Sequence, residues 1–526
     1  MMAQVNISRR SVHFWIYYFG LCLLVISLPA SRFMLTMSLM LLSVNWLAEA
    51  NFRERIKKYL SSKPAIAFTL IFGLNALGLL WSKDPGYAFN NDLLVKLPAL
   101  FMPVIFVTSP MPDIKKIRIL LLLFISSVVT VSFIGLSVRI FQSPVDFREA
   151  SPFVPSIYYS MMLLLAAFQL PLLIKQISDN RILYFICLAI SGWLIFFLFY
   201  LRSLSGLASL SGVLLFLSVL IIKSHRSAFL KISFTSVLIL LFGFALWLSA
   251  NMYKRTHLEA ETDYHALQEY TLQGNRYFHD TTNILRENGH LVYIYIADDE
   301  LKDVWNEKSE LDYYGHDLSD NHLRHTLYRY MSSKGLRKDK QGFTYLTDSD
   351  IQAVEKGTTN HLYVKWPGMF IRVHQMMMGV YIYKKTSYTN PAWSVLTERI
   401  DLWRASWQAF IKYPLLGWGT GSILHAVEYG LEKNDSALTG ENMKPHNQYI
   451  YILLNMGLFG LVVTVLLYSF IIMRTKVYRI FIYNVFIIVS TINFLANNSL
   501  ESQVGHSFFV FFTLFYCFHY PRRKTE

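Results

Sequence analysis

Three side chains in this sequence are of types that can bind a sugar phosphate or transfer a proton in its reaction: His446, Arg399 and Arg202. A neutral imidazole can accept a proton from an attacking hydroxyl group. Guanidinium groups hold phosphate oxygens through paired hydrogen bonds and stay charged. Each residue also has a plainer interpretation. His446 would be a boundary histidine, Arg399 a cation on a helix surface, and Arg202 an arginine that reaches lipid headgroups. The sequence therefore indicates a candidate base and two candidate anion-binding groups, beside structural alternatives.

A glycine-rich turn precedes His446, in the stretch TERIDLWRASWQAFIKYPLLGWGTGS. Apolar residues at helical spacing, Trp403 among them, predict a helix over residues 399–413 whose apolar face suits the roof of a membrane domain. Pro414 ends this helix. The turn then contains Gly417, Gly419 and Gly421. Such glycines can take positive φ angles and bring backbone N–H groups close to a ligand, although a tight surface turn is the more frequent explanation.

The segment around His446 reads MKPHNQYIYILLNMGLFG and leads into a long apolar run. Asn447 is expected to cap the helix that follows. Other chemistries lack their motifs: no P-loop, HExxH or Cys/His cluster occurs, so the sequence predicts no bound metal, no cofactor and no ATP hydrolysis.

Apolar segments of about 20 residues recur along the chain and predict an all-α polytopic membrane protein. The chain is 53% hydrophobic, and its formal charge is +14. Its basic residues lie mainly in alternate loops between these segments, which indicates membrane topology and not nucleic-acid binding. The bias predicts that both termini are cytoplasmic. About twelve spans are predicted, at residues 11–30, 33–50, 65–82, 93–109, 118–141, 156–174, 182–201, 204–222, 232–251, 448–473, 480–497 and 506–520. The fourth contains Lys96 and Pro98 and is the weakest.

One long loop, residues 252–447, separates the predicted membrane domains 1–251 and 448–526 and is expected to lie outside the cell membrane. It is expected to hold a small α/β insertion at about residues 289–357 and an active-site segment at about 397–447. The insertion is predicted to contain strands at residues 291–296 and 343–346, a helix from Asp298 through Trp305, and a helix capped near Thr347 to Ser349 and stopped by Gly357.

Two stretches, PLLGWGTG and PHNQYIYILLNMGLFG, follow Arg399 and Trp403 in this order ahead of a span, and they resemble the O-antigen ligase and polymerase superfamily. The span pattern is similar as well, and LWSKDPGYAFNNDLLVKLPALFMPVIF is similar to the third and fourth spans of Bacteroidetes-type members. The resemblance implies a GT-C-like glycosyltransferase of the bacterial inner membrane. Such an enzyme takes its glycan from undecaprenyl diphosphate at the periplasmic face, among membrane lipids.

The resemblance also implies residue roles. A histidine is the proposed general base of the family and two arginines engage the donor diphosphate, which would assign these roles to His446, Arg399 and Arg202. The family commonly reads SRxGL, whereas SLSGL here has Leu204 at the arginine position, so Arg202 is the expected substitute. The implied acceptor is a lipid A core; a growing glycan or a protein would use the same donor chemistry. A polysaccharide transporter or flippase is the non-catalytic alternative.

Overall fold

The computed structural model describes residues 9–142, 150–224, 227–385 and 394–520, and nearly all of its regular structure is helical, which confirms the all-α class. The chain divides into two compact units. Unit 1 comprises Met1–His225, Leu402–Asp435 and Thr439–Glu526, and unit 2 comprises Arg226–Asp401 and Ser436–Leu438. These units differ from the three predicted domains, because the ninth predicted span groups with the insertion and residues 402–435 group with the membrane helices.

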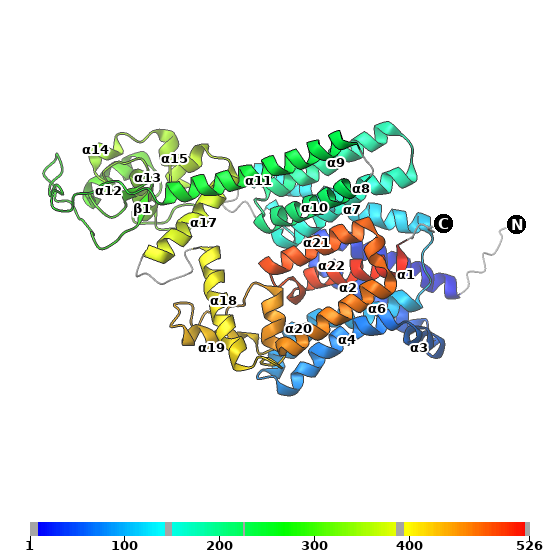
Figure 1. The fold of residues 1–526 in the computed structure, drawn as a ribbon. Helices are drawn as coiled ribbons and strands as arrows, with labels where there is room; N and C mark the ends of the chain where they lie inside the picture. Colours follow the sequence, from blue (N-terminus) through cyan, green and yellow to red (C-terminus); the bar gives the residue numbers. More distant parts are fainter. Residues whose placement is uncertain (1–8, 143–149, 225–226, 386–393, 521–526) are drawn as a thin grey trace. The chain divides into compact units, whose positions relative to one another are not determined.

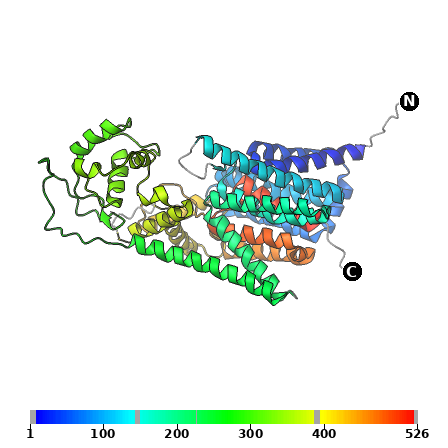
Figure 2. The same ribbon diagram turned by 90° about the horizontal axis from the view of Figure 1, so that it is seen from above.

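Unit 1 is built from helices, most of which are apolar and run roughly parallel to one another (Figures 1 and 2). They are α1 (Arg9–Ala30), α2 (Arg32–Ala48), α3 (Phe52–Ser61), α4 (Lys63–Leu77), α5 (Pro85–Tyr87), α6 (Leu94–Thr108), α7 (Ile114–Gln142), α8 (Ser156–Ile177), α9 (Arg181–Tyr200), α10 (Leu204–Lys223), α19 (Ile423–Lys433), α20 (Gln448–Thr475), α21 (Phe481–Ala496) and α22 (Gln503–Leu514). Short 3-10 or π-helical turns extend or join them: η1 (Gly78–Trp81), η2 (Ala88–Leu93), η5 (Val477–Arg479), η6 (Ser499–Glu501) and η7 (Phe515–His519).

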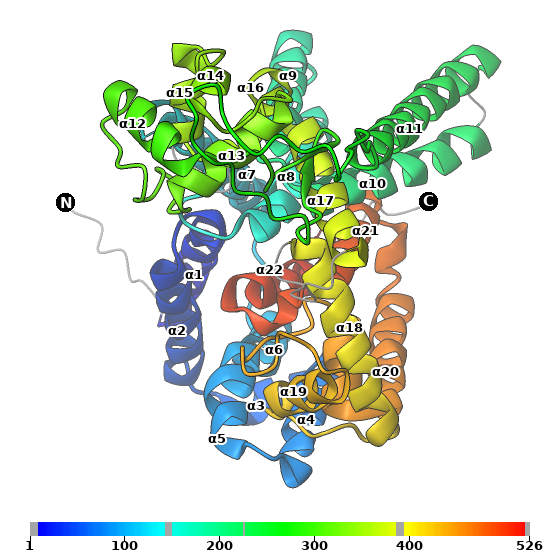
Figure 3. The ribbon, with the colours of Figure 1, turned by 90° about the vertical axis from the view of Figure 1, so that its left-hand side faces the viewer.

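Helix α22 lies inside unit 1, where it packs against α1, α6 and α21 (Figure 3). Its sequence is apolar on every side, as expected of a helix surrounded by other helices. Phe508, Phe511 and Phe512 are at most 1% exposed. The predicted span at residues 506–520 is therefore an interior helix of 12 residues extended by the π-helical turn η7.

The described residues contain nine helices long and apolar enough to cross a membrane, or ten if α2 and α3, which meet at 115°, form one span. The chain is thus a multi-pass membrane protein. Helix α21 is apolar but has only 16 residues. The clear spans are fewer than the twelve predicted, because α21 is short and α22 is an interior helix.

Unit 2 joins the long apolar helix α11 (Ala228–Thr256) to a set of smaller helices, the first four of which lie in the predicted insertion (Figure 1). These helices are α12 (Asp298–Lys308), α13 (Leu323–Ser333), α14 (Lys340–Phe343), α15 (Asp348–Glu355), α16 (Leu362–Lys365) and α17 (Gly368–Lys385). Helix α18 (Val395–Lys412) begins in unit 2 and continues into unit 1. A two-stranded antiparallel ribbon, β1 (Arg286–Glu287) with β2 (His290–Leu291), is the only sheet among the described residues.

Two strand predictions in the insertion are wrong. Strand β2 ends at Leu291, and residues 292–296 follow as turns and an isolated bridge. Tyr295 takes a φ of 55°, which interrupts an extended chain. Residues 343–346 end α14 and form a turn. Both runs are apolar because they border the core around Trp305, and burial of an irregular segment produces the same composition as a short strand.

Both helix predictions in the insertion are confirmed. Helix α12 begins at Asp298, with three acidic residues in its first turn. The side chain of Thr347 caps α15, and Asp350 completes a reciprocal capping box. Gly357 follows at a φ of 81°. Cap signals therefore located these helices well, because they act within a few residues of the sequence.

Candidate active site

The glycine-rich turn packs into a break in helix α20. Gly457 interrupts α20 at φ 62° and ψ −167°, a conformation that is essentially restricted to glycine. Four backbone hydrogen bonds of 2.7–3.1 Å join the turn to the break. They run from Trp418 and Gly419 to the carbonyl oxygens of Leu454 and Asn455, and from Leu458 and Phe459 to those of Pro414 and Leu415. The turn thus satisfies backbone groups that a broken membrane helix would otherwise leave without partners.

The three glycines of the turn are required by packing. Their φ angles are 69°, 93° and 89°, which confirms the predicted positive φ. A Cβ atom at Gly417 would lie 2.6 Å from the backbone nitrogen of Gly457, and one at Gly419 would lie 2.7 Å from the Cα of Ser82. One at Gly421 would meet Ala88 at 2.5 Å.

The amide groups of the turn donate to the protein itself. From Gly417 to Ser422, the acceptors are Tyr413, Leu454, Asn455 and Gly78 carbonyl oxygens, the Asp92 carboxylate and the Gly419 carbonyl oxygen. These N–H groups therefore bond to the protein itself, which agrees with the alternative of a tight structural turn. The turn thus has a structural role, because its hydrogen bonds fix the segment before His446 to the membrane helices.

A buried charged cluster, Asp92, Lys96 and Glu501, lies beside the turn. The Lys96 ammonium is 2.7 Å from the Glu501 carboxylate, and the two side chains are 6% and 2% exposed. The Asp92 carboxylate accepts hydrogen bonds from the Gly421 amide at 2.9 Å and the Tyr451 hydroxyl at 2.7 Å. Charges inside a membrane domain are costly and are usually retained for a purpose.

Part of this cluster has a signal in the sequence. Asp92 and Lys96 stand four residues apart at the start of an apolar run, a spacing that places both on one face of a helix, whereas the predicted weakness of the fourth span rests on Lys96 and Pro98 alone. Glu501 could not have been paired with them, because it lies about 400 residues later in the chain.

His446 occupies a left-handed backbone conformation, with φ at 48°. This conformation costs a non-glycine residue about 1–2 kcal/mol, although histidine is among the residues enriched there. Asn447 caps α20 as predicted: its side chain accepts hydrogen bonds from Tyr449 and Ile450 amides at 3.0 and 3.2 Å. The Trp403 indole donates to the Pro445 carbonyl oxygen at 2.8 Å, so α18 anchors the residue before His446.

Arg202 also has a left-handed conformation, with φ at 50°, in the turn between α9 and α10. Its side chain is half-buried, and Ser203 caps the helix that follows. Non-glycine residues in this conformation concentrate at functional sites. Two of the three candidate residues thus share a backbone feature that the sequence did not reveal.

One segment, residues 497–501, connects the surroundings of Arg202 and His446. Asn497 donates to the Tyr158 hydroxyl at 3.2 Å at the start of α8, a helix on which the α9–α10 turn packs through Gly206. The Leu500 amide donates to the Gln448 side chain at 2.8 Å, two residues after His446. The segment therefore contacts the start of α20, just after His446, and the start of α8, against which the first turn of α10, just after Arg202, packs.

Arg399 belongs to unit 2 and is the fifth residue of α18, which begins four residues before the predicted start. Burial lowers the pKa of its guanidinium, Glu398 raises it, and Arg372 lowers it further. Its buried Nε has no hydrogen-bond partner among the described residues. An orphaned charged donor of this kind is suited to an anionic ligand.

The predicted apolar face of α18 points outward. Trp403, Trp407 and Ile411 are 37%, 59% and 55% exposed, whereas the opposite face, with Leu402 and Ala405, is fully buried. Gly430 of α19 packs directly against the backbone of Ala405. The expectation that the aromatic face lies against the membrane domain is therefore wrong, because small residues on the other face permit closer helix packing.

Comparison with known proteins locates a domain in this part of the chain. Among curated proteins, none matches the chain in sequence. Residues 365–465 match a family model described as O-antigen ligase, and this range includes Arg399, the glycine-rich turn and His446. The match supports a function of the O-antigen ligase and polymerase type, which implies a polyprenyl-linked glycan donor and a glycan acceptor. Within residues 365–465, the chain is therefore similar to the O-antigen ligase family.

Proposed function

We propose that the protein is an O-antigen ligase that transfers a glycan from undecaprenyl diphosphate to a lipid A core at the periplasmic face of the bacterial inner membrane. The observation that carries the proposal is the position of His446. It lies inside the matched domain, in a left-handed backbone between Pro445, which Trp403 anchors, and the cap of α20. A costly conformation that is held from both sides is typical of a residue kept for chemistry.

In the proposed reaction, an acceptor hydroxyl oxygen attacks the anomeric carbon of the lipid-linked sugar. The new C–O bond forms as the bond from that carbon to the diphosphate oxygen breaks, so a direct transfer inverts the configuration. His446 takes the hydroxyl proton, and undecaprenyl diphosphate leaves with the bonding electron pair. The cleaved donor bond supplies the free energy, so no nucleotide is required.

Arg399 and Arg202 are proposed to bind the diphosphate and to stabilise its growing charge. The burial of Arg399 and its orphaned Nε support this role, and the left-handed backbone of Arg202 supports its assignment as the substitute for an arginine at Leu204. Because guanidinium groups would do the work of a metal ion, the reaction is proposed to be metal-independent.

The proposal is tested by offering purified protein a polyprenyl-diphosphate glycan together with one of three acceptors: lipid A core, a free glycan or a peptide. Mass gain on lipid A core, in excess EDTA and without nucleotide, is the expected result. Mass gain on only the glycan or only the peptide would instead establish a polymerase or a protein glycosyltransferase. Failure of all three acceptors with an intact donor would contradict the enzymatic proposal.

A further inference from the structure

An open groove crosses the insertion of unit 2, outside the segment that carries the proposed chemistry. It consists of two hollows of about 340 and about 410 Å³. Tyr293 and His325 line both hollows, so the two adjoin each other. The groove lies over the core that surrounds Trp305, which gives it a well-packed floor.

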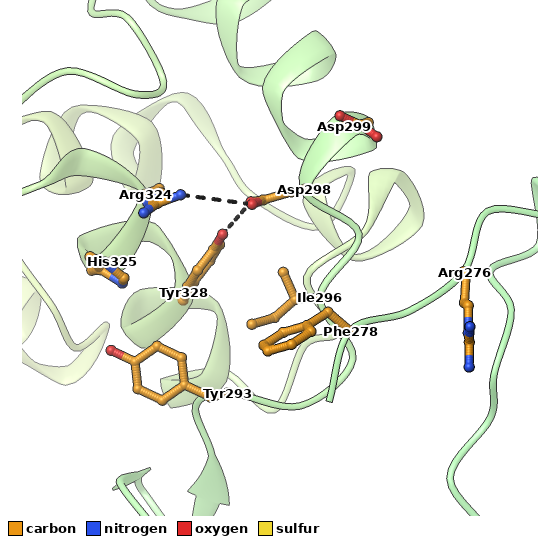
Figure 4. Close-up of a pocket in the computed structure, with 9 residues that line it drawn as sticks. All are labelled: Arg276, Phe278, Tyr293, Ile296, Asp298, Asp299, Arg324, His325 and Tyr328. Carbon is orange, nitrogen blue, oxygen red and sulfur yellow. Dashed lines mark hydrogen bonds and ion pairs between the residues drawn. The ribbon is translucent and has the colours of Figure 1, made fainter. Parts of the chain in front are cut away.

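Aromatic rings form a continuous row along this groove. The ring centres of His316 and His322 are 4.7 Å apart, those of His322 and His325 are 6.0 Å apart, and those of His325 and Tyr293 are 6.0 Å apart. Phe278 stands beside Ile296 in the first hollow (Figure 4) and is 62% exposed. A large exposed aromatic side chain at the edge of a hollow is available to a ligand.

Polar side chains of both signs line the same surface. In the first hollow, Arg324 and Tyr328 reach toward Asp298 (Figure 4), and Arg276 and Asp299 are exposed. In the second hollow, Asp320 and Asn321 are exposed. These groups offer planar donors and acceptors that can pair with neighbouring hydroxyl groups.

Three other classes of ligand fit the groove less well. In the part of the chain that the structure describes, no three His, Cys, Asp or Glu side chains form a group that could hold a metal ion, so the histidine row is not a metal site. Carboxylates balance the arginines, which disfavours a simple anion site. The many polar groups disfavour a lipid tail.

We propose that this groove binds a carbohydrate chain. A pyranose has an apolar face of C–H groups, which suits the aromatic row, and a rim of hydroxyl groups, which suits the planar polar side chains. Two adjoining hollows provide for successive sugar units. The assignment of the bound carbohydrate to the donor glycan or to the acceptor rests on the proposed function.

The test measures binding of free glycans to the full-length protein in detergent. The probes are the O-chain and the core oligosaccharide, each released by mild acid from the lipopolysaccharide of the producing strain. Phe278→Ala in one hollow and His322→Ala in the other should each weaken binding about five- to tenfold, the range for loss of an aromatic contact. Tyr345→Ala is the matched control, because Tyr345 is also 62% exposed and lies in unit 2 outside the groove.

Binding is measured again in His446→Ala protein, where it should persist without transfer, so that a failure of the proposed reaction does not affect the result. Preference for the O-chain or for the core oligosaccharide identifies the source of the glycan. The proposal is overturned if neither glycan binds saturably, or if inorganic phosphate displaces the glycan. It is also overturned if Phe278→Ala and His322→Ala, with unchanged melting temperatures, bind like Tyr345→Ala.

Discussion

At the scale of single residues, His446 and Arg202 join a reactive side chain to a left-handed backbone. An alanine substitution there changes both the chemistry and the backbone preference. Asparagine removes the titratable ring and still tolerates this conformation. Asparagine variants therefore separate the two contributions.

The first prediction concerns the proposed base. His446→Asn should lower the turnover number by about 10²- to 10⁴-fold, the range for loss of a general base, with little change in donor binding. Single-turnover transfer and equilibrium donor binding measure the two effects. Near wild-type turnover in a well-expressed variant would reduce His446 to a boundary residue.

The second prediction compares the arginines. Arg399→Lys retains the charge but loses the planar guanidinium group that binds phosphate through paired hydrogen bonds. It should therefore reduce transfer at least tenfold, about 1.4 kcal/mol of transition-state stabilisation. Arg202→Asn should produce a comparable loss if Arg202 has replaced the family arginine. A neutral Arg202→Asn variant, present in membranes at wild-type abundance, would assign Arg202 to headgroup contact instead.

At the scale of elements, the main finding is that the two sequence motifs bind each other. The turn in PLLGWGTG supplies partners to the break in NMGLFG, which explains why Gly417 and Gly457 are both needed. Spacing alone located the turn but could not reveal this contact, because the two glycines lie about 40 residues apart in the sequence.

The third prediction tests this contact between the glycine-rich turn and the break in α20. A Cβ at Gly457 would lie 2.2 Å from the Leu415 carbonyl oxygen. Gly457→Ala should therefore destabilise unit 1 by about 2–5 kcal/mol, from overpacking and backbone strain together. Gly440→Ala is the control, because Gly440 also has a positive φ, 90°, but no atom within 4 Å of its Cβ position. It should cost about 1 kcal/mol. Equal thermal unfolding midpoints for the two variants would disprove the structural role of this contact.

The fourth prediction concerns the buried ion pair. Lys96→Met leaves the Glu501 carboxylate without its cation and should destabilise the fold by about 3–5 kcal/mol. Adding Glu501→Gln should restore most of that stability, because an amide does not need the ammonium. Thermal unfolding of the single and double variants in detergent measures the rescue. No rescue would indicate that Lys96 stabilises Asp92 instead.

At the scale of the whole molecule, the sequence predicted the membrane class and the helix caps of the insertion, because these depend on local composition and a few neighbouring residues. It did not predict that α22 is an interior helix or that residues 292–296 are irregular, because both depend on what surrounds an apolar run. The Lys96–Glu501 pair shows the same limit within the candidate site, since long-range pairing is not encoded in spacing.

The last prediction concerns orientation in the membrane. Helix α3 carries exposed basic residues, Arg53, Lys57 and Lys58, and such residues concentrate on the cytoplasmic side. The insertion should then face the periplasm. A cysteine at exposed Ser61 should react with a membrane-impermeant thiol reagent only after spheroplasts are permeabilised, whereas one at exposed Glu310 should react in intact spheroplasts. Wild-type protein gives the background, because Cys22, Cys187 and Cys517 lie within apolar helices. The reverse labelling would place the insertion and its groove in the cytoplasm, where a periplasmic glycan could not reach them, and would contradict the proposed function and the carbohydrate site together.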